Sequence, residues 1–311
     1  MKRIIRPLLL LLFICILATR SQAQYYFYNE DYYDNPILFE IGASVGAMNA
    51  LTDVGGHSGL GQKYLKDLNT GKSQLNASVY VGAIYQNKVG LRLEFTSGQV
   101  TGADSVLKKD IGSPSDPRYD RNSSFRTPIT EFTAIVEIYP TYIFRKYDVE
   151  TSPPKLAPYF MIGIGYFHFN PQAYYKGQWV NLQPLRTEGE GFKEYPDRPI
   201  YSLSQTNIPL GLGVKYEINA RLNLRAEFLF RKLHTDYLDD VSKSYIDPTL
   251  FQNYLSGTQL QQALALSYRG GEIGKDHDHN PGAPRGNPKN NDSYFTFNIK
   301  AGLILGRARI R

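Results

Sequence analysis

The chain has almost no cysteine and, after its first two dozen residues, no long hydrophobic run. Its one cysteine among 311 residues is Cys15, close to the N-terminus. A small fold held together by disulfides is therefore excluded. No run of about 18 apolar residues follows residue 23, so the sequence predicts no transmembrane helix, because a helix needs about 20 such residues to cross a bilayer.

The chain also lacks the charge excess that is typical of nucleic-acid-binding proteins. Its formal net charge is +6 at pH 7, and 35 of its residues are Lys or Arg. Four of these basic residues and no acidic residue lie in residues 1–23, so the rest of the chain carries about +2. No nucleic-acid partner is expected.

Residues 1–23 have the pattern of a secretory signal peptide. Three basic residues precede an apolar run from Leu8 to Ala18, and Ser21-Gln22-Ala23 offers small residues at the cleavage positions. A run of about 11 apolar residues is too short to span a bilayer as a helix. We expect a signal peptide at 1–23, a periplasmic tyrosine-rich leader at 24–36 and a single domain at 37–311.

Eight segments of that domain alternate apolar and polar residues with a period of two. Residues i and i+2 share a face of a strand, so each segment is expected to be a strand with one apolar face. In the seventh segment, for example, Leu222 and Leu224 share one face while Arg225 and Glu227 share the other. The expected strands are 37–48, 75–86, 88–98, 130–144, 157–169, 206–217, 221–231 and 294–305.

The connections between these strands alternate between long and short. The long ones are 49–74, 99–129, 170–205 and 232–293, and the short turns lie near Asn87, Pro153 and Asn219. Outer-membrane barrels have an even number of antiparallel strands, short periplasmic turns and longer extracellular loops. The sequence therefore predicts an all-β fold: a transmembrane antiparallel β-barrel of eight strands in the cell outer membrane, with outer-membrane lipids against its apolar face.

The long loops carry signals of local structure. Lys176-Gly177 is expected to be the turn of a small hairpin, which leaves a count of ten strands open. Asp247-Pro248 predicts a helix start, Thr258 with Gln261 resembles a capping box, and Gly270 is a candidate helix end. The tract from Asp276 to Asn291 is rich in Pro, Gly and Asn, and is expected to be mobile.

The polar face of the strands carries charges of both signs. Paired carboxylates on one face can serve acid–base catalysis, but an eight-stranded barrel is only wide enough for side chains to fill it. A compensated ion-pair network inside a closed lumen is therefore expected instead of a catalytic site or an open pore. Its members are Glu40, Arg92, Glu94, Glu131, Glu137, Lys215, Arg225, Glu227, Arg231 and Lys300.

Two clusters invite a metal-site interpretation. His277-Asp278-His279 lacks companion ligands at a defined spacing. A second cluster lacks the interleaved Gly and terminal Glu of a calcium loop, so we expect it to serve helix capping and pairing with Arg231 and Lys232. This second cluster consists of Asp236, Asp239, Asp240 and Asp247. No catalytic, cofactor or metal site is predicted.

His168 is the sharpest candidate for an enzyme. It shares its strand face with Ile164 and Tyr166, so it is expected to face lipid near the outer end of its strand. Lipid A deacylases place a His–Ser pair on such a barrel wall, whereas Asn170 stands two residues after His168 here. An interfacial position is therefore expected for His168 rather than membership of a catalytic triad.

Several stretches resemble one family, the small outer-membrane barrels of Bacteroidota that include PorG, a component of the type IX secretion machinery. The matching stretches include 40–46, 51–56, 169–179, 182–189, 195–198, 208–215 and 231–242. The resemblance implies a partnership with the periplasmic ring proteins of that secretion system, and it supplies no catalytic residues.

Three functions follow from these patterns and this resemblance. The first is a non-enzymatic, structural or anchoring outer-membrane barrel associated with type IX protein secretion. The alternative is a surface adhesin or binding barrel that acts through its extracellular loops. The third and least favoured is a lipid-modifying enzyme centred on His168.

Overall fold

The computed structural model describes residues 36–55, 73–107, 117–144, 154–275 and 280–305. All of them lie in one compact unit, Pro36–Arg307. The expected signal peptide and nearly all of the expected leader lie outside the described residues. Among the residues that are described, no helix is long and apolar enough to cross a membrane.

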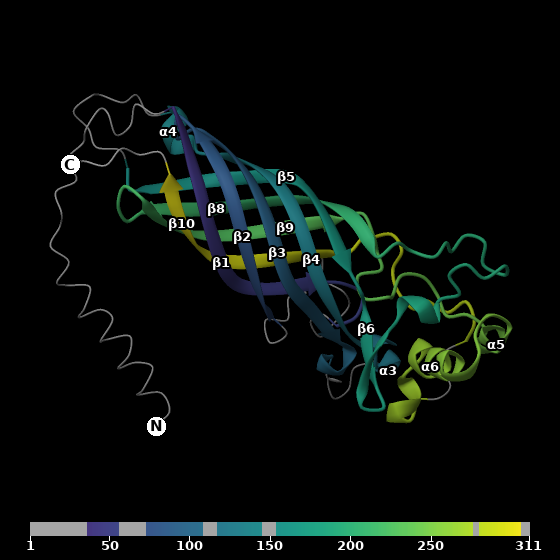
Figure 1. The fold of residues 1–311 in the computed structure, drawn as a ribbon. Helices are drawn as coiled ribbons and strands as arrows, with labels where there is room; N and C mark the ends of the chain where they lie inside the picture. The colour runs from purple at the N-terminus through teal and green to yellow at the C-terminus, as the bar shows by residue number, and fades with distance from the viewer. Residues whose placement is uncertain (1–35, 56–72, 108–116, 145–153, 276–279, 306–311) are drawn as a thin grey trace, which may run out of the picture. The chain divides into compact units, whose positions relative to one another are not determined.

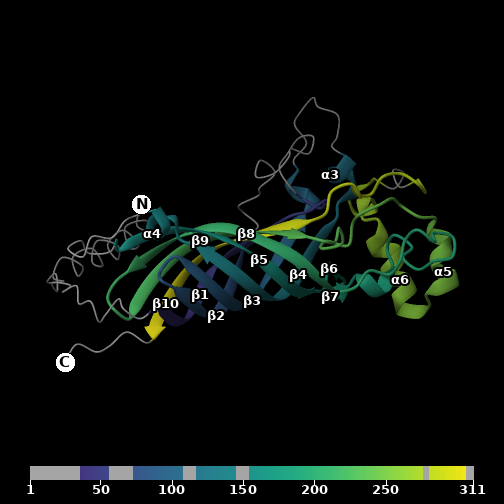
Figure 2. The same ribbon diagram turned by 90° about the horizontal axis from the view of Figure 1, so that it is seen from above.

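Eight antiparallel strands close into a barrel (Figures 1 and 2). Successive strands pair along the sheet, and the pairings β1–β10 and β3–β4 complete the closure. The barrel strands are β1 (Ile37–Leu51), β2 (Gln74–Tyr85), β3 (Val89–Ala103), β4 (Ser124–Ile138), β5 (Leu156–Phe169), β8 (Ser204–Glu217), β9 (Leu222–Leu233) and β10 (Ser293–Leu305). The predicted eight-stranded barrel is confirmed.

The predicted hairpin in the third long connection is also present. Strands β6 (Gln172–Tyr175) and β7 (Gln178–Asn181) pair with each other, and the pair Arg126–Gln172 joins them to β4. Both turn residues have positive φ, 46° at Lys176 and 86° at Gly177, as a tight hairpin turn of the type I′ class requires. The hairpin extends the sheet to ten strands without entering the barrel wall.

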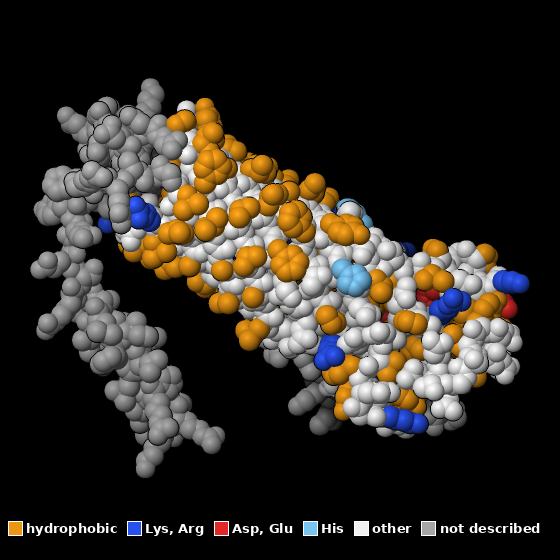
Figure 3. Space-filling view, viewed as in Figure 1, with side chains coloured by type: hydrophobic (Ala, Val, Ile, Leu, Met, Phe, Trp, Pro, Cys, Tyr) orange, Lys and Arg blue, Asp and Glu red, His pale blue; other side chains and the backbone are white. Residues whose placement is uncertain are grey.

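The barrel turns its apolar face outward. Ile164 is 72% exposed and Val45 is 66% exposed, whereas Arg92 and Lys300 are each 1% exposed. Figure 3 shows the hydrophobic side chains spread over the barrel wall. A soluble protein has its apolar side chains inside and its charged side chains outside. This barrel has the reverse arrangement, which a barrel embedded in lipid requires.

Two strands differ from their expected limits. The strand expected at 130–144 is β4, Ser124–Ile138, and β3 continues to Ala103 instead of ending at 98. The two strands pair with each other as far as Ala103–Ser124, and backbone pairing of this kind needs no apolar alternation in the sequence. At the other end, Pro140 has no N–H for a sheet hydrogen bond and begins the short helix α4 (Pro140–Phe144). The β4–β5 connection is therefore 139–155, longer than the predicted turn.

The described residues of the four long connections, including β6 and β7, form what we call the outer cap. Its other elements are η3 (Asp104–Val106), α3 (Pro117–Arg121), η4 (Gln183–Leu185), η5 (Pro248–Leu250), α5 (Phe251–Tyr254), α6 (Gly257–Ser267) and η6 (Gly270–Ile273). The cap lies at the end of the barrel opposite α4 (Figure 1).

The helix signals in the last connection are partly right. Asp247 caps η5 by accepting a hydrogen bond from the Thr249 N–H, as predicted. The capping box is wrong, because Ser256 precedes α6 and contributes no side-chain cap. Gly270 is wrong as a helix end, because α6 ends at Ser267 and Gly270 begins η6.

The tract expected to be mobile is held in place where the structure describes it. Residues 276–279 lie outside the described residues. In the remainder, the Ala283 carbonyl accepts from the Tyr245 N–H at 3.0 Å, and the Arg285 N–H donates to the Lys243 carbonyl at 2.8 Å. The Arg285 side chain is buried among polar groups of the cap, which supply the contacts that the local composition does not reveal.

Two apolar clusters hold the cap. The first joins the outer mouth of the barrel to the cap, since Phe167 and Tyr294 of the barrel belong to the same buried cluster as Leu238 and Val241. The second lies within the cap and includes Phe192 and the buried faces of α5 and α6. The cap is thus packed onto the barrel mouth.

Candidate functional site

All ten residues predicted for the lumen lie inside the barrel. None of them is more than 2% exposed. The cations are Arg92, Lys215, Arg225, Arg231 and Lys300, and the carboxylates are Glu40, Glu94, Glu131, Glu137 and Glu227. The two sets are equal in number, and Lys215 pairs with a further lumen carboxylate, Glu217, at 3.5 Å.

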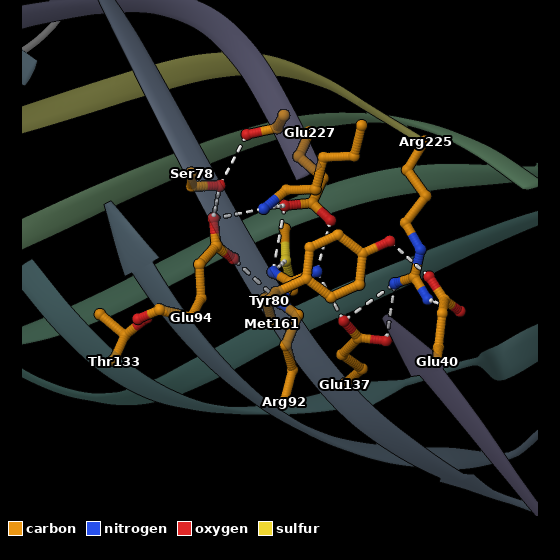
Figure 4. A network of polar contacts seen from close by, with 12 residues as sticks. Glu40, Ser78, Tyr80, Arg92, Glu94, Thr133, Glu137, Met161, Arg225 and Glu227 are labelled. Atoms are coloured by element: carbon orange, nitrogen blue, oxygen red, sulfur yellow. Dashed lines mark hydrogen bonds and ion pairs between the residues drawn. The ribbon is translucent and has the colours of Figure 1, made fainter. Parts of the chain in front are cut away.

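Two arginines organise one half of the network (Figure 4). Arg92 lies with Nη1 at 2.7 Å from Glu137 Oε1 and at 2.6 Å from Glu227 Oε1. Arg225 lies with Nη1 at 3.0 Å from Glu137 Oε2 and with Nη2 at 2.5 Å from Glu40 Oε2. Glu137 therefore links both guanidinium groups.

The remaining charges continue the network along the lumen. Lys300 Nζ lies 2.5 Å from Glu94 Oε1 and 3.3 Å from Glu227 Oε2. Nearer the cap, Arg231 Nη2 lies 3.0 Å from Glu131 Oε2. The network thus extends from strand to strand across the barrel interior.

Tyrosine hydroxyl groups complete the coordination of three carboxylates. Tyr80 donates to Glu40, Tyr139 to Glu137, and Tyr159 to Glu227. A buried charge is tolerated only when it is paired and hydrogen-bonded, and these donors provide that for the carboxylates. The arrangement fills the lumen, and its carboxylates are engaged with cations and hydroxyl groups.

A second polar network lies in the cap and joins stretches far apart in the sequence. The buried Glu188 accepts from the Ser242 N–H at 3.0 Å and the Lys243 N–H at 2.9 Å, and Arg285 Nη1 donates to it at 3.1 Å. Arg198 Nη1 donates to the Glu188 carbonyl at 2.7 Å. The stretches 182–189, 195–198 and 231–242, which were identified in the sequence by resemblance, thus meet in one place.

An ion pair that the sequence analysis missed anchors the other side of the cap. Arg121 binds Asp104 through two nitrogens, Nε at 2.7 Å from Oδ2 and Nη2 at 2.8 Å from Oδ1. The same guanidinium donates to the carbonyls of Asp53 and Arg285. Asp104 and Arg121 belong to the same β3–β4 connection, whereas Asp53 and Arg285 come from two other connections, so no sequence spacing signals the whole set of contacts.

Of the four aspartates considered for calcium, Asp236 and Asp239 lie near each other, and the contacts of Asp239, Asp240 and Asp247 are all within the protein. Asp239 accepts from the N–H groups of Val54 and Val241, Asp240 accepts from Thr187 and Tyr201, and Asp247 is a helix cap. The expected pairing with Arg231 and Lys232 is wrong: Arg231 is engaged with Glu131 in the lumen, and Lys232 is exposed on β9. Within the described parts of the chain, no group of three acidic, His or Cys side chains is arranged to hold a metal ion. His277-Asp278-His279 lies outside those parts.

Burial perturbs several cap carboxyls. It raises the pKa of Asp236 to about 8, and the nearby Asp53 and Asp239 add to the shift. Burial, with repulsion from Asp53, raises the pKa of Asp239 to about 7. Burial, with repulsion from Asp240 and Glu188, raises the pKa of Glu190 to about 8. These carboxyls therefore hold protons near neutral pH.

His168 has a hydroxyl partner that the sequence did not reveal. It is exposed on β5, as predicted, and its Nδ1 lies 3.1 Å from Ser204 Oγ. Ser204 is on β8, opposite His168 in the strand register. The sequence pattern of lipid A deacylases has the serine two residues after the histidine on one strand, so it does not reveal this partner. Among the described residues, no carboxylate hydrogen-bonds to His168, so the pair lacks the third member of a catalytic triad.

A closed antiparallel barrel with an apolar outer face and a charged interior leaves no unpaired sheet edge in lipid, which defines the class. The protein is an outer-membrane β-barrel. The chain belongs to the family described as a domain of unknown function, DUF6089, whose model matches residues 32–257. This family match does not by itself assign the chain to the PorG-like group that the sequence resembles.

The chain is also similar to solved outer-membrane barrels. Ail, the attachment invasion locus protein of Yersinia pestis, is 9% identical, with a TM-score of 0.34 over 86% of this chain and 97% of Ail. Neisserial surface protein A is 9% identical, with a TM-score of 0.37 over 85% and 96%. OprG from Pseudomonas aeruginosa is 10% identical, with a TM-score of 0.34 over 86% and 95%. No curated protein matches the sequence.

Proposed function

We propose that this protein is a non-enzymatic, non-conducting outer-membrane barrel that serves as a structural or anchoring component. The observation that carries the proposal is the ion-pair network across the lumen, which occupies the interior of the barrel with paired side chains. A barrel filled in this way offers no aqueous path. Its wall holds a packed outer cap on the membrane surface.

We further propose that the anchored assembly is the type IX secretion machinery. This more specific assignment is supported by the resemblance to PorG-like barrels. In this chain, the cap stretches that carry the resemblance form the network around Glu188. The partners are then periplasmic ring proteins. The end of the barrel opposite the cap offers a surface for them at α4, where Ile143 is 41% exposed and Phe144 is 84% exposed.

A secretion assay tests this role. The protein is deleted from its native host and replaced by wild type or by a variant with Ile143→Ser and Phe144→Ser. We expect the variant to reach the outer membrane, to lose co-purification of ring proteins and to reduce secretion. The matched control is Leu264→Ser, an exposed apolar residue of α6 on the cap, which should leave both unchanged. Normal secretion in the deletion strain would overturn the proposal.

A second candidate function is surface binding through the cap. It is favoured by the exposed aromatic tip of the hairpin, where Tyr174 and Trp179 are 49% and 42% exposed and the Arg126 guanidinium lies 4.0 Å from the centre of the Trp179 ring. Aromatic and Arg side chains are enriched at binding hot spots. Replacing Trp179 with Ala should then abolish adhesion while leaving secretion intact.

A further inference from the structure

The apolar wall of the barrel ends sharply on three neighbouring strands. On β5, β8 and β9 the last apolar outward residues before the cap are Tyr166, Ile208 and Phe230. One step closer to the cap, the outward positions become polar and basic. In Figure 3 the histidine side chains lie where the hydrophobic wall gives way to the cap. This level of an outer-membrane barrel meets the lipid headgroups.

The polar residues at this level form one patch, which we call the collar patch. His168 Nδ1 lies 3.1 Å from Ser204 Oγ, and His234 Nδ1 lies 2.9 Å from Thr206 Oγ1. Ser204 and Thr206 share a face of β8 and are about 7 Å apart along the strand. Lys232 is exposed near the end of β9, and His234 directly follows that strand and is also exposed. The collar patch is therefore His168, Ser204, Thr206, Lys232 and His234.

The outward wall carries no opposing charge at this level. Within the eight described barrel strands, every acidic residue has its side chain buried in the lumen. These residues are Glu40, Glu94, Glu131, Glu137, Glu217 and Glu227. Lys232 is exposed, and nothing acidic on the wall competes for it or for the two imidazoles. The patch thus offers one lysine ammonium, two imidazole groups and two hydroxyl groups.

We propose that the collar patch binds a phosphate group of a phosphorylated lipid in the outer leaflet. A lysine ammonium is a natural phosphate partner, and the imidazole and hydroxyl groups supply further hydrogen bonds. Because the apolar wall begins directly below, the acyl chains of the same lipid lie against Tyr166, Ile208 and Phe230. The inference depends on the position of the barrel in the membrane and not on the secretion role.

The experiment compares lipid retention by wild type and variants. Each protein is extracted from its own outer membranes in mild detergent, and native mass spectrometry measures the fraction that carries phosphorylated lipid. We expect the double variant with Lys232→Gln and His234→Gln to lose at least about tenfold in occupancy, and Lys232→Arg to retain it. The matched control is Lys289→Gln, which removes an exposed lysine of the cap and should have no effect.

Two further measurements check that each variant is folded and that the bound molecule is a lipid. Heat-dependent mobility on a gel shows that each variant is a folded barrel, so loss of lipid reflects the patch. A titration with inorganic phosphate distinguishes lipid from free anion. The proposal is overturned if the folded double variant retains lipid at the wild-type level, or if inorganic phosphate displaces the lipid at micromolar concentration.

Discussion

Arg92 on β3 and Glu227 on β9 form an ion pair across the lumen, with Nη1 2.6 Å from Oε1. The two strands are not neighbours in the barrel, so this contact crosses the interior instead of following the wall. Both side chains are at most 2% exposed. The pair therefore both fills the lumen and stabilises the barrel. A change at either residue should lower the stability of the barrel and open the lumen.

Removing one partner of this pair should be strongly destabilising. Arg92→Ala leaves Glu227 and Glu137 buried with fewer counter-charges, which costs about 3–5 kcal/mol for a buried pair. The measurement is the free energy of unfolding in urea with the protein in lipid vesicles. As a control, Arg221→Ala in the exposed β8–β9 turn should change it by less than about 0.5 kcal/mol. A loss at Arg92 no larger than at Arg221 would show that the network does not hold the barrel.

The Asp104–Arg121 pair should fix the outer cap without affecting the barrel. Asp104→Asn removes the charge that holds both Arg121 nitrogens, and we expect a loss of about 2–4 kcal/mol in the local stability of the cap. The single variant Arg121→Lys should lose a similar amount, because an ammonium cannot bind both oxygens of the Asp104 carboxylate as a guanidinium does. Amide hydrogen exchange measures both. Equal protection of α3 in wild type and variants would contradict this role.

The cap should lose stability as the pH rises. Burial raises the pKa of Asp236 and of Glu190 to about 8, whereas unfolded carboxyls titrate near 4. Between these values the folded chain binds more protons than the unfolded chain, so the free energy of unfolding falls with rising pH. The stability is greatest near pH 4 and is lost through about pH 8.

The single tryptophan, Trp179, lies in the cap and reports on this change. The urea midpoint of its fluorescence should be lower at pH 9 than at pH 6. Asp236→Asn carries no charge at any pH, so its midpoint should fall less over the same range. Parallel slopes for wild type and variant would rule out Asp236 as a source of the pH dependence.

The barrel and its lumen were predictable because their signals are local. Alternation shows which face of a strand is apolar, and charges on the other face, such as Arg92 and Glu137, are then placed in the lumen. The limits of β4 were not predictable, because strand pairing continued beyond the alternating pattern and Pro140 ended it early.

The cap and the collar patch were less accessible to sequence reasoning. Arg121 meets the carbonyls of Asp53 and Arg285, and Glu188 meets Ser242, through packing of separate connections that no spacing in the sequence encodes. Ser204 was missed for a similar reason, since it reaches His168 across two strands that are joined by a long connection. A sequence can show that a strand residue faces outward. Which residue lies beside it on the next strand depends on how the two strands are aligned, and the sequence does not show that alignment.

Paired charges close the lumen, and ion conductance through single purified barrels in a planar lipid bilayer measures that closure. We expect no stepwise conductance from the wild type at moderate voltage. A variant with Arg92→Ala, Arg225→Ala and Glu227→Ala should either conduct or fail to fold. Regular, voltage-independent open steps from the folded wild-type protein would contradict the account.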